Sequence, residues 1–261
     1  MRRERAPLAI GILAVAGAAF FILPLIGLVV RTPWADAARA VTSADTLEAL
    51  RLSLVASLTA TGVALVLGVP LAWVYARIEF PGRSVLRALT TLPMVLPPVV
   101  GGIALLLAFG RRGLLGSWLE SSFGISLPFT TAGVVFAETF VAMPFLVLTV
   151  EAGLRSMDRR YEDAARTLGA KRWTIFTRVT LPLIAPSLFA GAVLCWARAL
   201  GEFGATITFA GNFPGVTQTM PLAVYLLLGT NPEGSYILSL ILLVVSLVVL
   251  VGLRHRWLGS A

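Results

Sequence analysis

The chain has 261 residues, of which 57% are hydrophobic and 13% are charged, and its mean hydropathy is +0.89. An ordinary soluble domain is about one quarter charged and roughly half apolar, so one soluble core cannot hide this much apolar surface. The composition excludes a disordered chain, a collagen and a disulfide scaffold, and it indicates an integral membrane protein. The single cysteine, Cys195, makes neither an internal disulfide nor a cysteine metal cage.

Six apolar segments predict six transmembrane helices, because a spanning helix needs roughly 20 mostly apolar residues. They cover about 8–30, 52–76, 88–109, 129–151, 184–210 and 235–253. The first segment has about 22 apolar residues, too many for the core of a secretory signal, which favours an uncleaved first helix. The loops leave no room for a soluble domain, so we expect a single membrane domain over residues 1–261.

The net charge of +8 and the pI near 10.9 would suggest a nucleic-acid partner in a soluble protein. In a membrane protein, lysine and arginine instead gather on the cytoplasmic side. With the N-terminus inside, about fifteen basic residues lie in inside segments and five in outside segments. The sequence therefore predicts cytoplasmic termini at both ends and no nucleic-acid partner.

The third apolar segment carries helix breakers. Pro93, Pro97 and Pro98 lie in its first half, followed by Gly101 and Gly102. Proline removes a backbone donor and bends a helix, and such a break persists in a bilayer only where protein or water covers the freed carbonyls. This helix is expected to face other helices or a transport pathway, and a plain packing kink is the alternative.

Several kinds of enzyme site are missing from the sequence. A phosphate-binding P-loop needs a Gly-Lys pair, and the one lysine, Lys171, follows Ala170. The one histidine, His255, lies in the C-terminal tail, where it cannot form a paired-histidine zinc site. We therefore predict no catalytic residue, no cofactor and no metal site in this chain.

The polar stretch between the fourth and fifth segments contains a short amphipathic helix. Asp158 is placed to cap its start and Gly169 to end it. Four side chains at helical spacing form one apolar face: Tyr161, Ala164, Ala165 and Leu168. A helix of about ten residues is marginal alone in water, so it must pack on something. It packs either on the chain's own cytoplasmic surface or in a socket of a partner.

This stretch resembles the signature of the membrane subunits of bacterial ABC importers. That pattern is Glu-Ala-Ala, three residues, Gly, nine residues, Ile, one residue, Leu-Pro. The chain matches its spacing at the following positions: Asp163, Ala164, Ala165, Gly169, Val179, Leu181 and Pro182. Asp163 replaces the glutamate and Val179 the isoleucine, and Glu162, one residue earlier, can share the acidic role.

The resemblance implies an all-α type I ABC importer permease fold with six transmembrane helices and a cytoplasmic coupling loop at about 156–182. In that family the short helices dock in a groove of a separate ATPase subunit, which explains the missing P-loop. It also implies two such ATPase subunits, an extracytoplasmic binding protein and a second copy of this chain. The expected location is a bacterial or archaeal cell membrane.

The fifth segment contains two charged residues, Arg198 and Glu202, four positions apart and so on one helix face. A lone charge in the bilayer centre costs about 2.5–3.5 kcal/mol, and pairing lowers this cost. The pair is either a gate or anion-path element, for which arginine suits oxyanions, or a structural ion pair. Glu138, in the fourth segment, is either a partner of Arg198 or hydrated in a vestibule.

A turn rich in glycine and proline follows the fifth segment, over about 210–225. It carries neutral polar side chains, namely Asn212, Thr217, Gln218 and Thr219. We expect an external loop there. It is an ordinary loop, a contact for a solute-binding protein, or a set of donors at the mouth of the pathway.

The runs 197–206 and 214–225 resemble permeases for tetrahedral oxyanions, the second run most of all those for molybdate. The resemblance implies import of molybdate or tungstate, with a sulfate or thiosulfate permease as the alternative. The residues by themselves leave these divalent anions open. Two rivals from other classes are an ATP-independent secondary transporter or channel and a membrane-embedded enzyme or assembly anchor.

Overall fold

The computed structural model describes residues 7–258, and every regular element in that range is a helix. The longer helices are α1 (Leu8–Arg31), α3 (Ala44–Arg77), α5 (Pro98–Phe109), α7 (Thr131–Ser156), α11 (Ala185–Leu200), α13 (Met220–Thr230) and α14 (Pro232–Leu258). Shorter helices connect them, namely α2 (Trp34–Val41), α4 (Arg83–Thr91), α6 (Gly116–Phe123), α8 (Arg160–Thr167), α9 (Arg172–Ile175), α10 (Leu181–Leu183) and α12 (Gly204–Ala210). A 3₁₀ turn (Leu92–Met94) follows α4, and a π-helical turn (Phe176–Thr180) follows α9.

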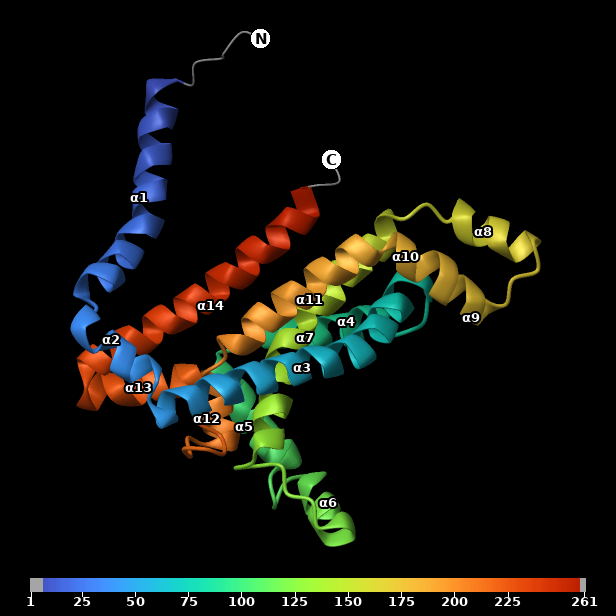
Figure 1. Ribbon diagram of the computed structural model, residues 1–261. Coiled ribbons are helices and arrows are strands. Elements are labelled where there is room, and N and C mark those ends of the chain that lie inside the picture. Colours follow the sequence, from blue (N-terminus) through green and yellow to red (C-terminus); the bar gives the residue numbers. More distant parts are fainter. Residues whose placement is uncertain (1–6, 259–261) are drawn as a thin grey trace.

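The predicted spans correspond to helices of the structure (Figure 1). By length and composition, α1, α3, α7 and α14 can each cross a membrane, and two bent helix pairs raise the number to six within the described residues. The second span begins at Ala44 instead of residue 52. Ser43 caps it there, because its Oγ accepts a hydrogen bond from the Thr46 N–H at 3.4 Å.

The centre of the bundle is formed by α3, α7 and α11, which lie side by side (Figure 1). A stripe of small buried residues runs along α3: Ala49, Ser53, Ala56, Ala60, Ala64, Gly68 and Ala72. Small side chains let helix backbones approach closely, which favours helix association in a bilayer. Leu146 and Val147 of α7 fill the space against this stripe.

The predicted break in the third span is confirmed and is sharper than a kink. The pair formed by α4 and α5 is bent by 118°, so the helix expected over 88–109 is not continuous. Pro97 caps α5 and Pro98 opens it, at positions where a missing N–H loses no helical hydrogen bond. Since α5 packs on α12, protein covers this side of the break.

The prediction of one continuous fifth helix over 184–210 is wrong. The helix α11 ends at Leu200, and α12 begins at Gly204 after an irregular stretch. Glu202 stabilises the break, because its Oε1 accepts a hydrogen bond from the Ala205 N–H at 2.8 Å and so caps α12. A polar side chain that satisfies backbone groups makes such an interruption tolerable inside a membrane.

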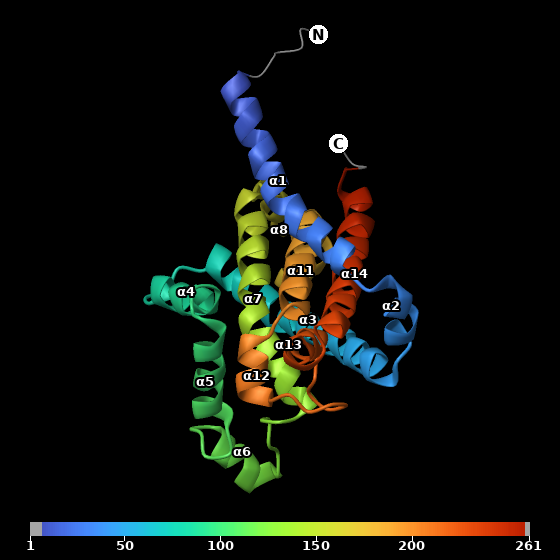
Figure 2. The ribbon, with the colours of Figure 1, turned by 90° about the vertical axis from the view of Figure 1, so that its left-hand side faces the viewer.

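The first helix stands apart from the bundle, and none of its residues is buried within the described chain. Figure 2 shows the Leu8 end of α1 and the C-terminal end of α14 toward the top of the view, with α6 toward the bottom. The exposed apolar surface of α1 is therefore available to lipid or to another protein chain.

A close helix contact gives the first testable prediction. A methyl group added at Gly102 of α5 would lie 2.6 Å from Thr208 Cβ and 2.9 Å from the Ala205 oxygen, both on α12. Gly102→Ala is expected to lower the free energy of unfolding by about 1–3 kcal/mol through over-packing. Gly62→Ala is the matched control, because nothing lies within 4 Å of its added methyl group. Equal thermal unfolding of the two variants would contradict the close packing of α5 on α12.

Candidate functional site

The coupling loop projects from one end of the bundle as two short helices, α8 and α9 (Figure 1). Asp158 Oδ1 accepts a hydrogen bond from the Arg160 N–H at 2.9 Å, which confirms the expected start of α8. Gly169 ends the helix with φ of +80°, in the left-handed region that glycine adopts without strain. Its N–H donates to the Arg166 oxygen at 2.9 Å. The tight reversal between α8 and α9 is therefore present as predicted.

Glu162 faces the membrane domain and is only 4% exposed. It accepts hydrogen bonds from the Arg77 Nη2 at 3.3 Å and from the Thr180 hydroxyl at 2.8 Å. The first bond reaches back to the end of α3 and the second to the turn before α10. Glu162 thus ties the coupling loop to two other parts of the chain.

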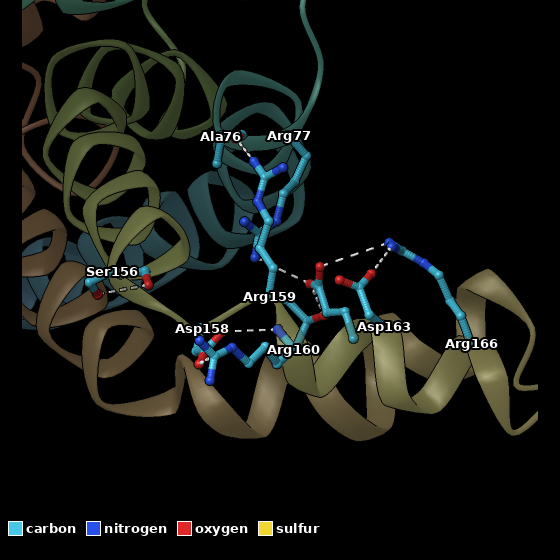
Figure 3. A network of polar contacts seen from close by, with 11 residues as sticks. Ala76, Arg77, Ser156, Asp158, Arg159, Arg160, Asp163 and Arg166 are labelled. Carbon is cyan, nitrogen blue, oxygen red and sulfur yellow. Dashed lines mark hydrogen bonds and ion pairs between the residues drawn. The ribbon is translucent and has the colours of Figure 1, made fainter.

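Asp163 points away from the bundle and lies on the exposed side of α8. Its Oδ1 contacts the Arg166 Nη1 at 2.6 Å, and both side chains are more than half exposed. Figure 3 shows this pair beside the hydrogen bond that the Arg159 guanidinium donates to the Ala76 oxygen at the end of α3. The two neighbouring acids therefore have different surroundings, one anchored in the scaffold and one on the surface.

The apolar face predicted for α8 is uncovered in the single chain. Tyr161 is 58% exposed and Leu168 is 88% exposed, while Ala164 is exposed and Ala165 half-buried. Trp173, at the start of α9, is 73% exposed. Large apolar groups that gather at an exposed loop mark a contact surface. The loop therefore does not use this face to pack on its own chain.

The Leu-Pro end of the signature lies where the loop rejoins the bundle. Leu181 opens α10 and packs against the central cluster that contains Tyr75 and Leu154. Pro182 occupies the first turn of α10, where its ring is compatible with the helix. The end of the loop is thus packed directly against residues of α3 and α7.

Sequence reasoning missed a second polar network at the same end of the bundle. Glu151 of α7 is buried and contacts both Arg87 and Arg155, the latter at 2.9 Å. The backbone oxygen of Tyr75 accepts hydrogen bonds from Arg83 and from Arg155. The spacing of Glu151 and Arg155, one helical turn apart, was the available signal. This network joins α3, α4 and α7 next to the coupling loop.

Arg198 and Glu202 form the predicted ion pair, with 2.6 Å between Nη2 and Oε2. Glu202 is 1% exposed but lies in the break after α11, so the pair is not on one continuous helix. Glu138 of α7 is also 1% exposed, and within residues 7–258 it forms no ion pair with Arg198. No group of three or more potential metal ligands occurs among the described residues.

The loop that the sequence predicted to be external is shorter than expected, because α13 begins at Met220. Thr217 is fully buried and its Oγ1 accepts a hydrogen bond from the Phe213 N–H at 2.9 Å, which holds the turn together. Thr219 is 1% exposed and Asn212 is half-buried. Gln218 is half-buried and lines a cavity of about 450 Å³ that is bounded by this loop, the start of α3 and the helices α13 and α14. Of the four predicted residues, Thr217 thus serves the turn itself.

Comparison with known proteins gives matches over most of the chain. Residues 64–260 match the family model described as the binding-protein-dependent transport system inner membrane component. The chain is 48% identical to the molybdenum transport system permease protein ModB of Mycobacterium tuberculosis, over 93% of this chain and 92% of that protein. It is 38% identical to the sulfate transport system permease protein CysT of Escherichia coli, over 85% of this chain and 81% of that protein.

A solved structure shares the fold. The chain superposes on a bacterial ABC transporter involved in the import of the acidic polysaccharide alginate with a TM-score of 0.74 and 19% identity. The match covers 97% of this chain and 95% of that one. The predicted type I importer fold is therefore confirmed.

Fold and sequence together define a multi-pass permease subunit of an ABC importer, located in the inner membrane and without ATPase activity of its own. More narrowly, the chain belongs to the family of binding-protein-dependent transport system inner membrane components. The resemblance of the coupling loop to ABC importer permeases is confirmed. The comparisons do not support the rival interpretations as a secondary transporter, an enzyme or an anchor.

Proposed function

We propose that this chain forms the membrane pathway of an importer for a divalent tetrahedral oxyanion, molybdate or tungstate. The observation that supports this substrate most directly is the 48% identity to a molybdenum transport permease over nearly the whole chain. Arginine in the membrane at position 198 fits an anionic substrate, because its guanidinium group matches oxyanion oxygens.

The coupling loop is proposed to dock on an ATPase subunit through Tyr161, Ala164 and Leu168. Their exposure supports this role, and so does the anchoring of the opposite face of α8 through Glu162. The family requires a binding protein and an ATPase. We propose two ATPase subunits, an extracytoplasmic binding protein and two copies of this chain, each a single permease domain over residues 1–261.

Both termini are proposed to lie in the cytoplasm. The concentration of arginine in the coupling loop and at the chain ends supports this orientation. In Figure 2 the N-terminal end of α1 and the C-terminal end of α14 lie toward the same end of the molecule, and α6 lies toward the other. This arrangement supports placing both termini on one side of the membrane.

ATP-dependent uptake into proteoliposomes tests the proposed function. The vesicles contain this chain, its ATPase and the binding protein, with molybdate, tungstate and sulfate offered separately. We expect uptake of molybdate or tungstate over sulfate, and no uptake with an ATPase lacking its P-loop lysine. Uptake that survives this control would contradict ATP-driven transport. A preference for sulfate would instead support the second candidate, a sulfate permease, which the 38% identity to CysT favours.

The Arg198–Glu202 pair is proposed to line or gate the pathway, and its structural role can be separated from transport. Arg198→Gln leaves a buried carboxylate without its partner, which is expected to cost roughly 3–5 kcal/mol of stability. The double variant with Glu202→Gln removes both charges and is expected to recover most of that stability. Uptake by the double variant is expected to stay low. Normal uptake by a stable double variant would show that the pair is only structural.

A further inference from the structure

A cavity of about 280 Å³ lies between the end of α3 and the inner face of the coupling loop. Four arginines line it, Arg77 from α3 and Arg159, Arg166 and Arg172 from the loop, against a single carboxylate, Glu162. Arg77 is at least 82 residues away in the sequence from the other three arginines, which all belong to one short loop. A recess lined mainly by positive charge raises the local concentration of anions.

The one carboxylate in this cavity cannot accept hydrogen bonds from all the guanidinium donors around it. Glu162 takes one hydrogen bond from Arg77 at 3.3 Å, and the Arg166 Nη2 lies 3.9 Å from its other oxygen. The Arg166 Nη1 is paired with Asp163 outside the cavity, at 2.6 Å. The Arg77 side chain is only 8% exposed, and its Nε has no hydrogen-bond partner among the described residues. Arg172 forms no ion pair with any residue that the structure describes, and Arg159 reaches only the Ala76 oxygen, at 3.4 Å. Guanidinium donors therefore outnumber the acceptors around the recess.

The apolar part of the cavity wall indicates where the recess sits. Trp73, near the end of α3, contacts Phe176 edge to face, with 6.4 Å between ring centroids, and both side chains line the cavity. Tryptophan at the end of a spanning helix is typical of the boundary between hydrocarbon and water. The cavity is thus within reach of dissolved ions and of lipid headgroups.

We propose that this cavity binds a phosphate-type oxyanion, which joins Arg77 of α3 to the arginines of the coupling loop. Guanidinium groups bind such oxygens with paired, charge-assisted hydrogen bonds. The volume is below the roughly 300–1,000 Å³ of pockets for drug-sized molecules and suits a small ion with water. Bound there, the anion stiffens the link between the docking helices and the bundle. It is either free phosphate or the phosphate of an anionic lipid.

Binding is tested with the full chain in nanodiscs of neutral lipid. Thermal unfolding is followed as inorganic phosphate is added, with ionic strength held constant by sodium chloride. We expect a saturable rise in the unfolding temperature. Arg172→Gln is expected to weaken phosphate binding about tenfold or more, since hydrogen bonds to charged groups contribute strongly. Arg178→Gln is the matched control, because Arg178 is exposed on the same loop and does not line the cavity.

A second arm replaces the neutral lipid by phosphatidylglycerol and omits free phosphate. Stabilisation in this arm alone, lost in Arg172→Gln and kept in Arg178→Gln, assigns the site to a lipid headgroup. Stabilisation by free phosphate that is lost in Arg172→Gln and kept in Arg178→Gln assigns the site to the dissolved ion. If neither arm stabilises the protein, or if Arg172→Gln and Arg178→Gln respond alike, the cavity is not an oxyanion site.

Discussion

Replacing Gly169 by proline is expected to reduce ATP-driven uptake about tenfold or more while the protein still inserts into the membrane. Gly169 has φ of +80°, and proline is confined to a φ near −65°, so α8 cannot reverse into α9 at this position. A strain of 1–3 kcal/mol in the docking loop corresponds to about one to two orders of magnitude in an equilibrium. Uptake into proteoliposomes and ATP hydrolysis by the complex are measured together, and we expect hydrolysis that no longer depends on substrate.

The matched control for this variant is Gly124→Pro at the other end of the molecule. Gly124 ends α6 with φ of +66°, its N–H donates to the Glu120 oxygen at 3.0 Å, and nothing lies within 4 Å of an added methyl group. The backbone change is therefore equivalent, but it lies far from the coupling loop. If both variants lose uptake equally, general misfolding explains the loss and Gly169 has no special role in coupling.

Glu162→Ala is expected to lower the free energy of unfolding by roughly 3–5 kcal/mol, because it leaves Arg77 buried without its carboxylate. The neighbouring substitution Asp163→Ala removes an exposed pair with Arg166 and is expected to cost about 0–1 kcal/mol. Chemical unfolding of the detergent-solubilised protein measures both. The two acids differ by one position in the sequence, so the comparison isolates the effect of burial.

The same two variants separate anchoring from docking. If Glu162 holds the loop on the bundle, Glu162→Ala uncouples ATP hydrolysis from uptake, whereas Asp163→Ala weakens only contacts on the loop surface. Equal stability of the two variants would be inconsistent with the buried contacts of Glu162 to Arg77 and Thr180. The thermal stability of Glu162→Gln provides a further check, since the amide keeps the hydrogen bond from the Thr180 hydroxyl.

The membrane class, the spans and the place of the coupling loop were all predictable from the sequence. An apolar run predicts a span and a glycine predicts the end of a helix, and both depend only on nearby residues. The spacing of the signature from Asp163 to Pro182 was specific enough to indicate a permease. Continuity of the spans was less predictable. The fifth apolar run contains no proline between Pro186 and residue 203, yet the helix ends at Leu200. The Glu202 side chain caps the next helix there, and hydropathy carries no information about that bond.

The surroundings of the charged residues were decided only by the tertiary structure. Sequence spacing placed Glu162 and Asp163 together as an acidic pair, but Glu162 turns inward to an arginine 85 residues earlier in the chain. Likewise, Glu138 is buried and forms no ion pair with Arg198 among the described residues, and Arg155 donates a hydrogen bond to the backbone oxygen of Tyr75. The periodicity of a helix and the length of an apolar segment depend on residues that are neighbours in the sequence, so the sequence alone determines them. The pairing of a buried charge depends on which distant helices pack together, and only the folded chain brings those groups within hydrogen-bond distance.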